Sequence, residues 1–217
     1  VNDIEPSSRK YPGIFFKQER ETGDQILNVQ GLTLKPYFKD LNFSLYKGDK
    51  VVILSKDSLA ITNFFRVIVG ELKPDSGTFD WGITINKAYF PNDKDHFFET
   101  DYSLIDWLRQ YSTEKDETFI RGFLGRMLFS GEESLKSCSV LSGGEKVRCM
   151  LSRLMLQNPN LMILDEPTNH LDLESITALN NGLKNFEGNL IFTSRDHAIV
   201  QTIANRIIEI TPNGMID

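Results

Sequence analysis

Leu161-Met162-Ile163-Leu164-Asp165-Glu166 is a run of four apolar residues followed directly by two carboxylates. A continuous apolar run of this length is typical of a strand that is buried on both faces, as in a parallel sheet. Ligands of open α/β sheets bind at the carboxyl ends of the strands, where Asp165 and Glu166 are expected. One such carboxylate can hold Mg²⁺ while the next polarises an attacking water. Alone, the run is weak evidence, since it fits a strand that simply ends in solvent even better.

Strands and helices are expected to alternate on both sides of this run. The apolar pattern predicts strands at 26–29, 41–45, 51–54, 161–164, 189–193 and 206–210. It predicts helices around 65–72, across 104–129, from 145 to 157, from 173 to 185 and after Asp196. Alternation of this kind indicates an α/β fold with a mostly parallel sheet. The helical middle, about 101–157, is expected to form an inserted second lobe.

The composition fits one large α/β domain of an intracellular protein. The chain has 217 residues and a net charge of −6, which argues against a surface whose main task is to coat nucleic acid. Cys138 and Cys149 match no metal or redox spacing, so a reducing compartment is expected. No apolar run approaches the ~18–20 residues that cross a bilayer. We therefore expect a cytoplasmic location and no membrane partner.

Two further motifs flank the opening run. Leu141-Ser142-Gly143-Gly144-Glu145 lies about twenty residues upstream, and Pro167-Thr168-Asn169-His170-Leu171-Asp172 follows directly. On these residues the chain resembles ATP-binding-cassette (ABC) nucleotide-binding domains. Residues 141–145 match the signature motif, 164–166 the end of Walker B, and 171–172 the D-loop. The run 165–172 resembles the ABC-F branch in particular, whose members are soluble tandem cassettes without transmembrane domains.

The resemblance implies a fold, cofactors and a position in a longer protein. The implied fold is an ABC-type P-loop NTPase core with an antiparallel β subdomain and an inserted helical subdomain. ATP and Mg²⁺ are the implied cofactors. Residues 25–217 would form the nucleotide-binding domain, and residues 1–24 the end of an interdomain linker. Pro6-Ser7-Ser8-Arg9 resembles the end of the linker that joins two cassettes, which would make this chain the second one.

The signature segment has a physical basis for contacting phosphate. Ser142, Gly143, Gly144 and Glu145 are expected at the start of a long helix, where free N–H groups and the helix dipole attract anions. The two glycines let a phosphate approach the backbone closely. The resemblance implies that this loop and Asp172 contact ATP held by a partner cassette, either the N-terminal domain of the same chain or a second copy. The plainer interpretation is a Gly-Gly turn with Ser142 as helix cap.

The phosphate-binding loop departs from its pattern. A P-loop reads G-x-x-x-x-G-K-[ST], and the segment in register is Ser55, Lys56, Asp57, Ser58, Leu59, Ala60, Ile61 and Thr62, followed by Asn63. Ser55 and Ala60 stand at the framing glycines and Ile61 at the lysine. Losing one charge-assisted contact costs about 1.5–3 kcal/mol, and tenfold in affinity is about 1.4 kcal/mol. Weak or absent ATP and Mg²⁺ binding is therefore expected, although Thr62 and Asp165 remain as metal ligands and Lys56 is a candidate replacement cation.

Three more positions depart from the family pattern. The Q-loop glutamine corresponds to Asn92, and the switch histidine corresponds to Arg195, which cannot transfer a proton near neutral pH. Glu166, the catalytic position, would then be vestigial. His197 is expected on the surface. The short connection between Leu32 and Phe38 is expected to lack the aromatic residue that stacks on adenine in the family, and Tyr37 is the only candidate for that role nearby.

Three functions remain open at this point. In the first, the chain contributes Ser142, Gly143, Gly144 and Asp172 to a partner's ATP site, in a protein that engages the ribosome. In the second, it binds Mg·ATP weakly through Thr62 and Asp165 and hydrolyses it with Glu166. In the third, it is a non-hydrolysing structural or regulatory module. Five basic residues are candidates for an RNA-facing patch but are expected mostly as solvated helix faces: Arg121, Arg126, Lys136, Arg148 and Arg153.

Overall fold

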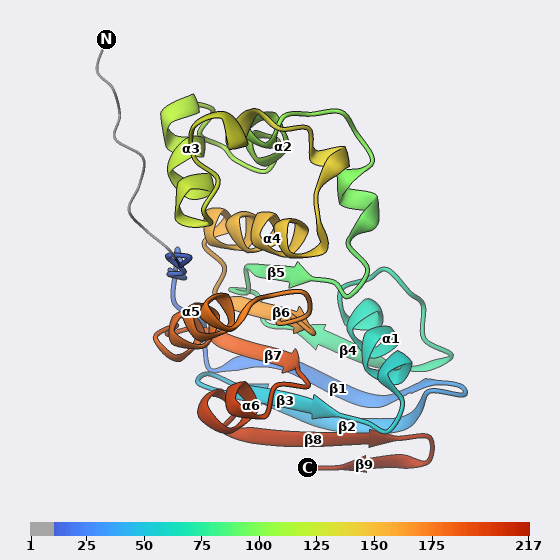
Figure 1. Ribbon diagram of the computed structural model, residues 1–217. Coiled ribbons are helices and arrows are strands. Elements are labelled where there is room, and N and C mark those ends of the chain that lie inside the picture. Colours follow the sequence, from blue (N-terminus) through green and yellow to red (C-terminus); the bar gives the residue numbers. More distant parts are fainter. Residues whose placement is uncertain (1–10) are drawn as a thin grey trace. The chain divides into compact units, whose positions relative to one another are not determined.

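The computed structural model describes residues 11–217, which form two compact units (Figure 1). The sheet unit comprises Lys17–Asn92, Pro159–Pro167 and Phe186–Asp217. The helical unit comprises Asp93–Asn158, Thr168–Asn185 and the segment that ends at Phe16. The expected linker end at 6–9 lies outside the described residues.

The sheet unit contains two sheets. A three-stranded sheet has the order β2-β1-β4, and a six-stranded sheet has the order β5-β6-β7-β3-β8-β9. The strands are β1 (Gln25–Leu34), β2 (Phe38–Tyr46), β3 (Lys50–Leu54), β4 (Ser76–Trp81), β5 (Lys87–Phe90), β6 (Leu161–Asp165), β7 (Asn189–Thr193), β8 (Arg206–Thr211) and β9 (Gly214–Ile216).

The strand directions confirm the expected fold class. The three-stranded sheet is antiparallel throughout. In the six-stranded sheet the pairs from β5 to β8 are parallel, and only β9 runs antiparallel to its neighbour. In β6 and β7 every residue is buried, as continuous apolar runs in a parallel sheet require. The fold is thus α/β, with a mostly parallel sheet, an antiparallel sheet and helices.

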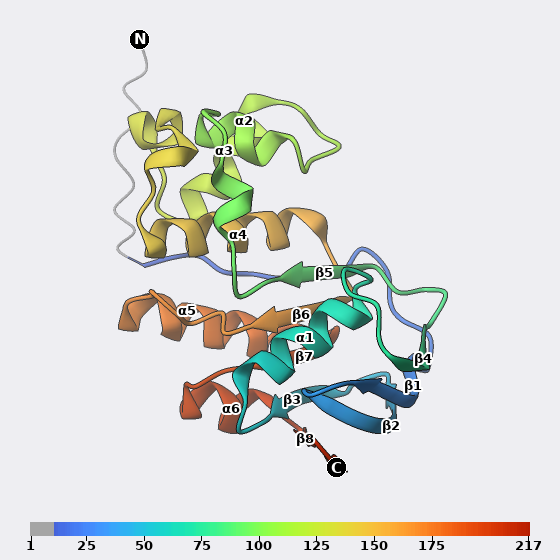
Figure 2. The same ribbon diagram turned by 90° about the vertical axis from the view of Figure 1, so that its right-hand side faces the viewer.

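One helix joins the two sheets into a single core. Helix α1 (Ser58–Ile68) begins directly after β3, as both ribbon views show (Figures 1 and 2). Its apolar residues pack with residues of both sheets in one buried cluster, and Phe64 contacts Phe38 and Phe43 ring to ring. Because α1 is held from both sides, the strand–helix junction at its start is fixed. Helix α6 (His197–Ile203) completes this unit.

The helical unit has its own apolar core. Its helices are α2 (Leu104–Arg109), α3 (Glu117–Arg126), α4 (Gly143–Gln157) and α5 (Leu173–Lys184), with three 3-10 turns at Asp95–Phe98, Gly131–Leu135 and Cys138–Val140. Trp107 is fully buried, stacks on Phe98 at 4.9 Å between ring centroids and donates from Nε1 to the Phe97 carbonyl. Among the described residues, no helix is long and apolar enough to cross a membrane.

Some boundaries differ from the sequence-based expectation. Helix α4 begins at Gly143 rather than Glu145, because Ser142 serves as its N-cap. Helix α1 ends at Ile68 rather than near Leu72, because Gly70 takes a left-handed conformation with φ 87°. The pattern gave no sign of β4, β5 and β9, which are short or rich in residues with low strand propensity.

Candidate functional site

The junction between β3 and α1 is where a phosphate loop would lie. The Asp57 side chain caps α1, because the Leu59 N–H donates to Asp57 Oδ1 at 3.0 Å. The Asp57 N–H in turn donates to Ser55 Oγ at 3.1 Å. Free N–H groups and the helix dipole are what attract anions to a helix start. Here the chain's own carboxylate occupies that position, which the Asp-before-helix pattern at 57–60 would have allowed us to predict.

The two residues at the second glycine and lysine positions are part of the core. Ala60 is 1% exposed and Ile61 is 5% exposed, and both pack in the cluster that joins the sheets. Asn63 is also buried and accepts weakly from Arg66. Ile61 carries no charge, so the positive charge that attracts a phosphate would have to come from another residue.

The two residues predicted to hold Mg²⁺ are hydrogen-bonded to one another. Thr62 Oγ1 donates to Asp165 Oδ2 at 2.6 Å, and Asp165 is 2% exposed at the end of β6. A hydroxyl and a carboxylate are oxygen ligands of the kind that Mg²⁺ prefers. Burial, followed by the charge of Asp165, raises the pKa of the nearby Tyr89 hydroxyl. The negative charge of Asp165 thus acts on a neighbouring residue of the sheet unit.

Glu166 is bound by the residue at the switch position. It has a left-handed backbone, φ 53°, and its N–H donates to the Thr193 carbonyl. The Arg195 N–H donates to Glu166 Oε2 at 3.0 Å, and Arg195 Nε lies 3.9 Å from Oε1. His197 is exposed, as expected.

Part of the phosphate-loop segment, together with Glu166 and Arg195, lines an open pocket of about 290 Å³. Its two cations, Lys56 and Arg195, are exposed at its rim. Its lining consists of Leu54, Ser55, Lys56, Ser58, Ile61, Glu166, Thr193, Ser194 and Arg195. The sheet unit therefore brings together the predicted phosphate-loop, Walker B and switch positions.

The signature segment is the start of α4 in the helical unit. Ser142 and Glu145 form a reciprocal capping box, in which the Glu145 N–H donates to Ser142 Oγ and the Ser142 N–H to Glu145 Oε1. Burial alone would raise the pKa of Glu145, but hydrogen bonds from Lys136 and Ser142 lower it below its usual range. The N–H groups of Gly143 and Gly144 are at the first positions of the helix, where no partner within a helix exists.

Asp172 is the N-cap of α5. Its Oδ1 accepts from the Ser175 N–H at 2.8 Å. Hydrogen bonds from the Ser175 side chain and backbone lower the pKa of Asp172. Capping thus accounts for an aspartate here independently of any partner.

The remaining predicted positions do not line the pocket of about 290 Å³. Asn92 is exposed two residues after β5, and Tyr37 packs against the core cluster of the sheet unit. Cys138 and Cys149 are both buried and unbonded to one another.

The interpretation of the basic residues as solvated helix faces is largely wrong. Arg126 is exposed, but the other four are half-buried with partners inside the helical unit. Arg121 bonds Ser134, Lys136 pairs with Glu145, Arg148 stacks on Phe129, and Arg153 stacks on Phe97 and Tyr111. Long basic side chains here cover apolar surface with their stems, which a linear charge pattern does not reveal.

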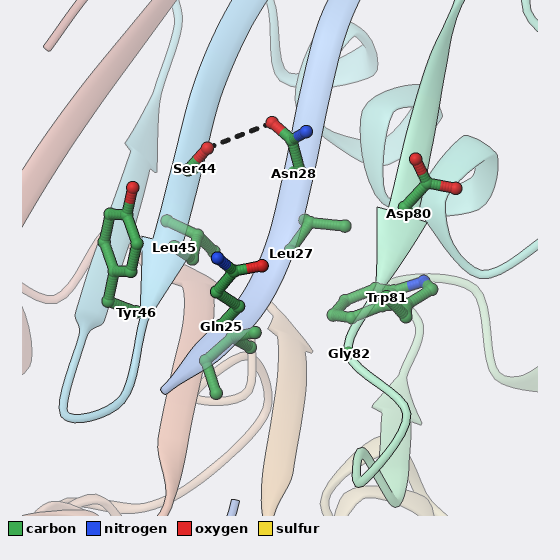
Figure 3. Close-up of a pocket in the computed structure, with 10 residues that line it drawn as sticks. Gln25, Leu27, Asn28, Ser44, Leu45, Tyr46, Asp80, Trp81 and Gly82 are labelled. Carbon is green, nitrogen blue, oxygen red and sulfur yellow. Dashed lines mark hydrogen bonds between the residues drawn. The ribbon is translucent and has the colours of Figure 1, made fainter. Parts of the chain in front are cut away.

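Two further hollows contain none of the predicted catalytic or nucleotide-binding residues. Figure 3 shows one of about 280 Å³ on the three-stranded sheet, where Ser44 Oγ donates to Asn28 Oδ1 at 3.0 Å beside Tyr46, Asp80 and Trp81. The other, about 770 Å³, lies in the helical unit between the segment Tyr11 to Phe15 and one face of α5.

Comparison with known families agrees with the motifs. The family model described as ABC transporter matches residues 38–169, more than half of the chain. A solved dimeric ATP-binding cassette in a post-hydrolysis state, bound to ADP and Pi, covers 88% of the chain and 97% of its own length at a TM-score of 0.73 and 14% identity. That likeness concerns the fold.

Curated relatives are considerably longer than this chain. The ABC transporter ATP-binding protein YkpA of Bacillus subtilis is 57% identical over 100% of the chain and 41% of its own length. The energy-dependent translational throttle protein EttA of Escherichia coli is 32% identical over 94% of the chain and 38% of its length. ABC transporter F family member 5 of Arabidopsis thaliana is 29% identical over 98% of the chain and 31% of its own length. The chain thus spans about two fifths or less of these relatives.

Proposed function

The chain belongs to the ABC transporter ATP-binding family, and from that premise we propose that it is the second cassette of a two-cassette ABC-F protein. In this proposal, the chain contributes Ser142, Gly143, Gly144 and Asp172 to an ATP site whose phosphate loop belongs to the partner cassette. Its own phosphate loop neither binds nor hydrolyses ATP effectively. The similarity to an ABC transporter F family member and the short share of each relative's length support this assignment.

The observation that carries the proposal is the self-capped start of α1. The Asp57 carboxylate accepts the Leu59 N–H at 3.0 Å, in the place where a nucleotide phosphate would accept it. A phosphate approaching this helix end would meet a like charge instead of a lysine. These residues therefore do not fit the triphosphate, even though Thr62 and Asp165 fit a magnesium ion.

Isothermal titration of the 217-residue chain with Mg·ATP tests the proposal. We expect no saturable heat up to millimolar nucleotide. A matched variant, Ser55→Gly/Asp57→Asn/Ala60→Gly/Ile61→Lys, restores the P-loop pattern and should gain saturable binding by about a hundredfold or more in affinity. Micromolar binding by the unaltered chain would refute the proposal.

A role in translation is the biological context that we propose. It rests on the similarity to a protein named as a translational throttle, and it makes the ribosome or its RNA the expected partner. A cytoplasmic location follows from that role. Co-sedimentation of the whole protein with ribosomes, in the presence and absence of ATP, would test it.

The intact Thr62–Asp165 pair favours a second candidate function, weak hydrolysis at the chain's own site. It predicts slow Mg²⁺-dependent ATP turnover by the 217-residue chain. Asp165→Asn should abolish such turnover, whereas turnover that survives this substitution would come from a contaminant.

A further inference from the structure

The loop between Pro167 and α5 packs on the start of α4 within the helical unit. His170 takes a left-handed backbone conformation with φ 65°, and the Leu171 N–H donates to the Thr168 carbonyl at 3.2 Å. A non-glycine residue in this region is uncommon and persists where its surroundings favour it. The turn brings both the imidazole and the carbonyl of His170 against the signature glycines.

His170 leaves no room for a side chain at either glycine. A Cβ at Gly143 would lie 2.9 Å from Cγ and 3.1 Å from Nδ1 of the His170 ring. A Cβ at Gly144 would lie 2.8 Å from the His170 carbonyl oxygen. Contacts this short require atoms to move. A Cβ at Gly143 would therefore displace the side chain of the exposed His170, whereas one at Gly144 would meet a backbone atom of the same residue.

We infer that His170 is a positioning residue that holds the signature loop in place and links it to Asp172. The inference rests on the proposed function, because it concerns how the chain presents its signature loop to a partner's nucleotide. Asp172 lies two residues after His170 and fixes the start of α5 through the Ser175 N–H. The loop 168–172 therefore carries both the residue that lies against the signature glycines and the aspartate that caps α5.

Other reasons for the two glycines do not account for this geometry. Close approach of a partner's phosphate would favour glycine but would not place the His170 ring 2.9 Å from a Cβ built at Gly143. Glycine is otherwise unfavourable in a helix, so a site with open space would gain from alanine. Gly122 in α3 is such a site, since nothing lies within 4 Å of a Cβ built there.

Hydrogen exchange measured by mass spectrometry on the whole protein tests the contact locally. Gly143→Ala should raise exchange in peptides covering 141–146 and 168–173 by about tenfold, as loss of local stability predicts. Gly143→Ala/His170→Ala should return exchange to the level of His170→Ala alone, because the ring is gone. Gly144→Ala/His170→Ala should show no such recovery, because its obstacle is a backbone oxygen. Gly122→Ala is the matched control and should leave both peptides unchanged.

The inference is wrong if Gly143→Ala behaves like the Gly122→Ala control or if the double variant shows no recovery. ATP turnover by the whole protein adds a functional readout. His170→Ala should lower kcat severalfold with KM little changed, and His170→Phe, which keeps a flat ring against Gly143, should restore it. A third outcome separates the contact from the function: exchange recovers in Gly143→Ala/His170→Ala, but no change at Gly143 alters ATP turnover. That result would refute the proposed function, while the contact between His170 and Gly143 would stand.

Discussion

Asp57 and Thr62 lie in the same strand–helix junction and have opposite consequences for nucleotide binding. Thr62 keeps its hydroxyl on the buried Asp165 carboxylate at 2.6 Å, as a metal site needs. Asp57 places a carboxylate at the start of α1. Two like charges 4 Å apart near a protein surface repel by up to about 4 kcal/mol, before screening by solvent. The aspartate thus adds a repulsion, reduced by solvent screening, to the attraction that is lost with the lysine.

The Thr62 hydroxyl is predicted to stabilise the fold even without nucleotide. Thr62→Val should lower the free energy of unfolding by about 1–2 kcal/mol, because the buried Asp165 carboxylate loses one of its donors. Urea denaturation of the 217-residue chain measures this change. Thr177 is the control, since its hydroxyl bonds the Leu173 carbonyl on an exposed helix face and Thr177→Val should cost less than about 0.5 kcal/mol. Equal effects of the two substitutions would contradict the prediction.

Asp172 is predicted to stabilise α5 in a pH-dependent way. Its pKa is lowered in the folded state, so its contribution is complete above the ordinary aspartate pKa of about 3.9 and is lost as pH falls through the lowered value. Asp172→Ala should cost about 0.5–2 kcal/mol at pH 7 and much less at pH 3.

Asp172→Asn supplies the comparison, because asparagine caps a helix without titrating. The free energy of unfolding of Asp172→Asn should be close to that of the unaltered chain at pH 7. At pH 3 it should be higher than that of the unaltered chain. Urea unfolding at the two pH values measures both variants. An alanine penalty that is the same at pH 7 and pH 3 would show that the carboxylate charge is not involved.

At the scale of single residues, the sequence predicted the positions of the motif residues better than the contacts that these residues make. The P-loop register at 55–62, the carboxylates after β6 and Arg195 at the switch position were all readable from the pattern. The bond from the Arg195 N–H to Glu166 was not, because it joins residues 29 apart in sequence. The same holds for His170 against Gly143. Such pairs are determined by how loops fold back, and no local spacing encodes them.

At the scale of elements, predictability followed the strength of the local pattern. The buried strands β3, β6 and β7 and the helices α4 and α5 have continuous or periodic apolar residues and were expected. Strand β4 was not expected, since Gly77 and Asp80 disfavour strands. Its glycine is needed because a Cβ at Gly77 would lie 2.3 Å from the Gly31 carbonyl oxygen of β1. Pairing with a distant strand thus overrides local propensity.

Two helix glycines in the helical unit should respond oppositely to the same substitution. Gly122→Ala in α3 should raise the free energy of unfolding by about 0.5–1 kcal/mol, because alanine favours the helix and meets nothing. Gly182→Ala in α5 should lower it by about 1–3 kcal/mol, because its Cβ would lie 2.7 Å from Ile14 Cγ2 and 3.0 Å from the Ile14 carbonyl. Chemical denaturation of both variants measures the difference. Two changes of the same sign would contradict the packing of the Ile14 segment on α5.

At the scale of the whole molecule, the chain has the parts of a cassette but spans only about two fifths of YkpA. The sequence was enough to identify the family, because three motifs occur in the order and spacing that the family shares. It was not enough to show what faces the signature loop, since the proposed partner group would belong to another cassette. The proposed division of labour between two cassettes is tested on the whole protein.

ATP turnover by the whole protein should depend on the signature loop and not on this chain's own Glu166. Glu166→Gln should leave kcat within about twofold, because the Glu166 carboxylate is already bound by the Arg195 N–H and the phosphate position is self-capped. Ser142→Arg should lower kcat by at least about tenfold, because a long cation would fill the space in front of the two glycines; one lost contact of ~1.4 kcal/mol already gives that factor.

The arginine substitution needs its own control, because it also removes a helix cap worth about 1 kcal/mol. Ser103→Arg serves, since the Ser103 side chain also caps a helix, α2, by accepting from the Asp106 N–H, and it lies outside the predicted site. Thermal unfolding should show Ser142→Arg folded at the assay temperature, so that its loss of turnover reflects the site. If Glu166→Gln abolished turnover while Ser142→Arg left it intact, the catalytic carboxylate would be in this chain and the proposed asymmetry would be reversed.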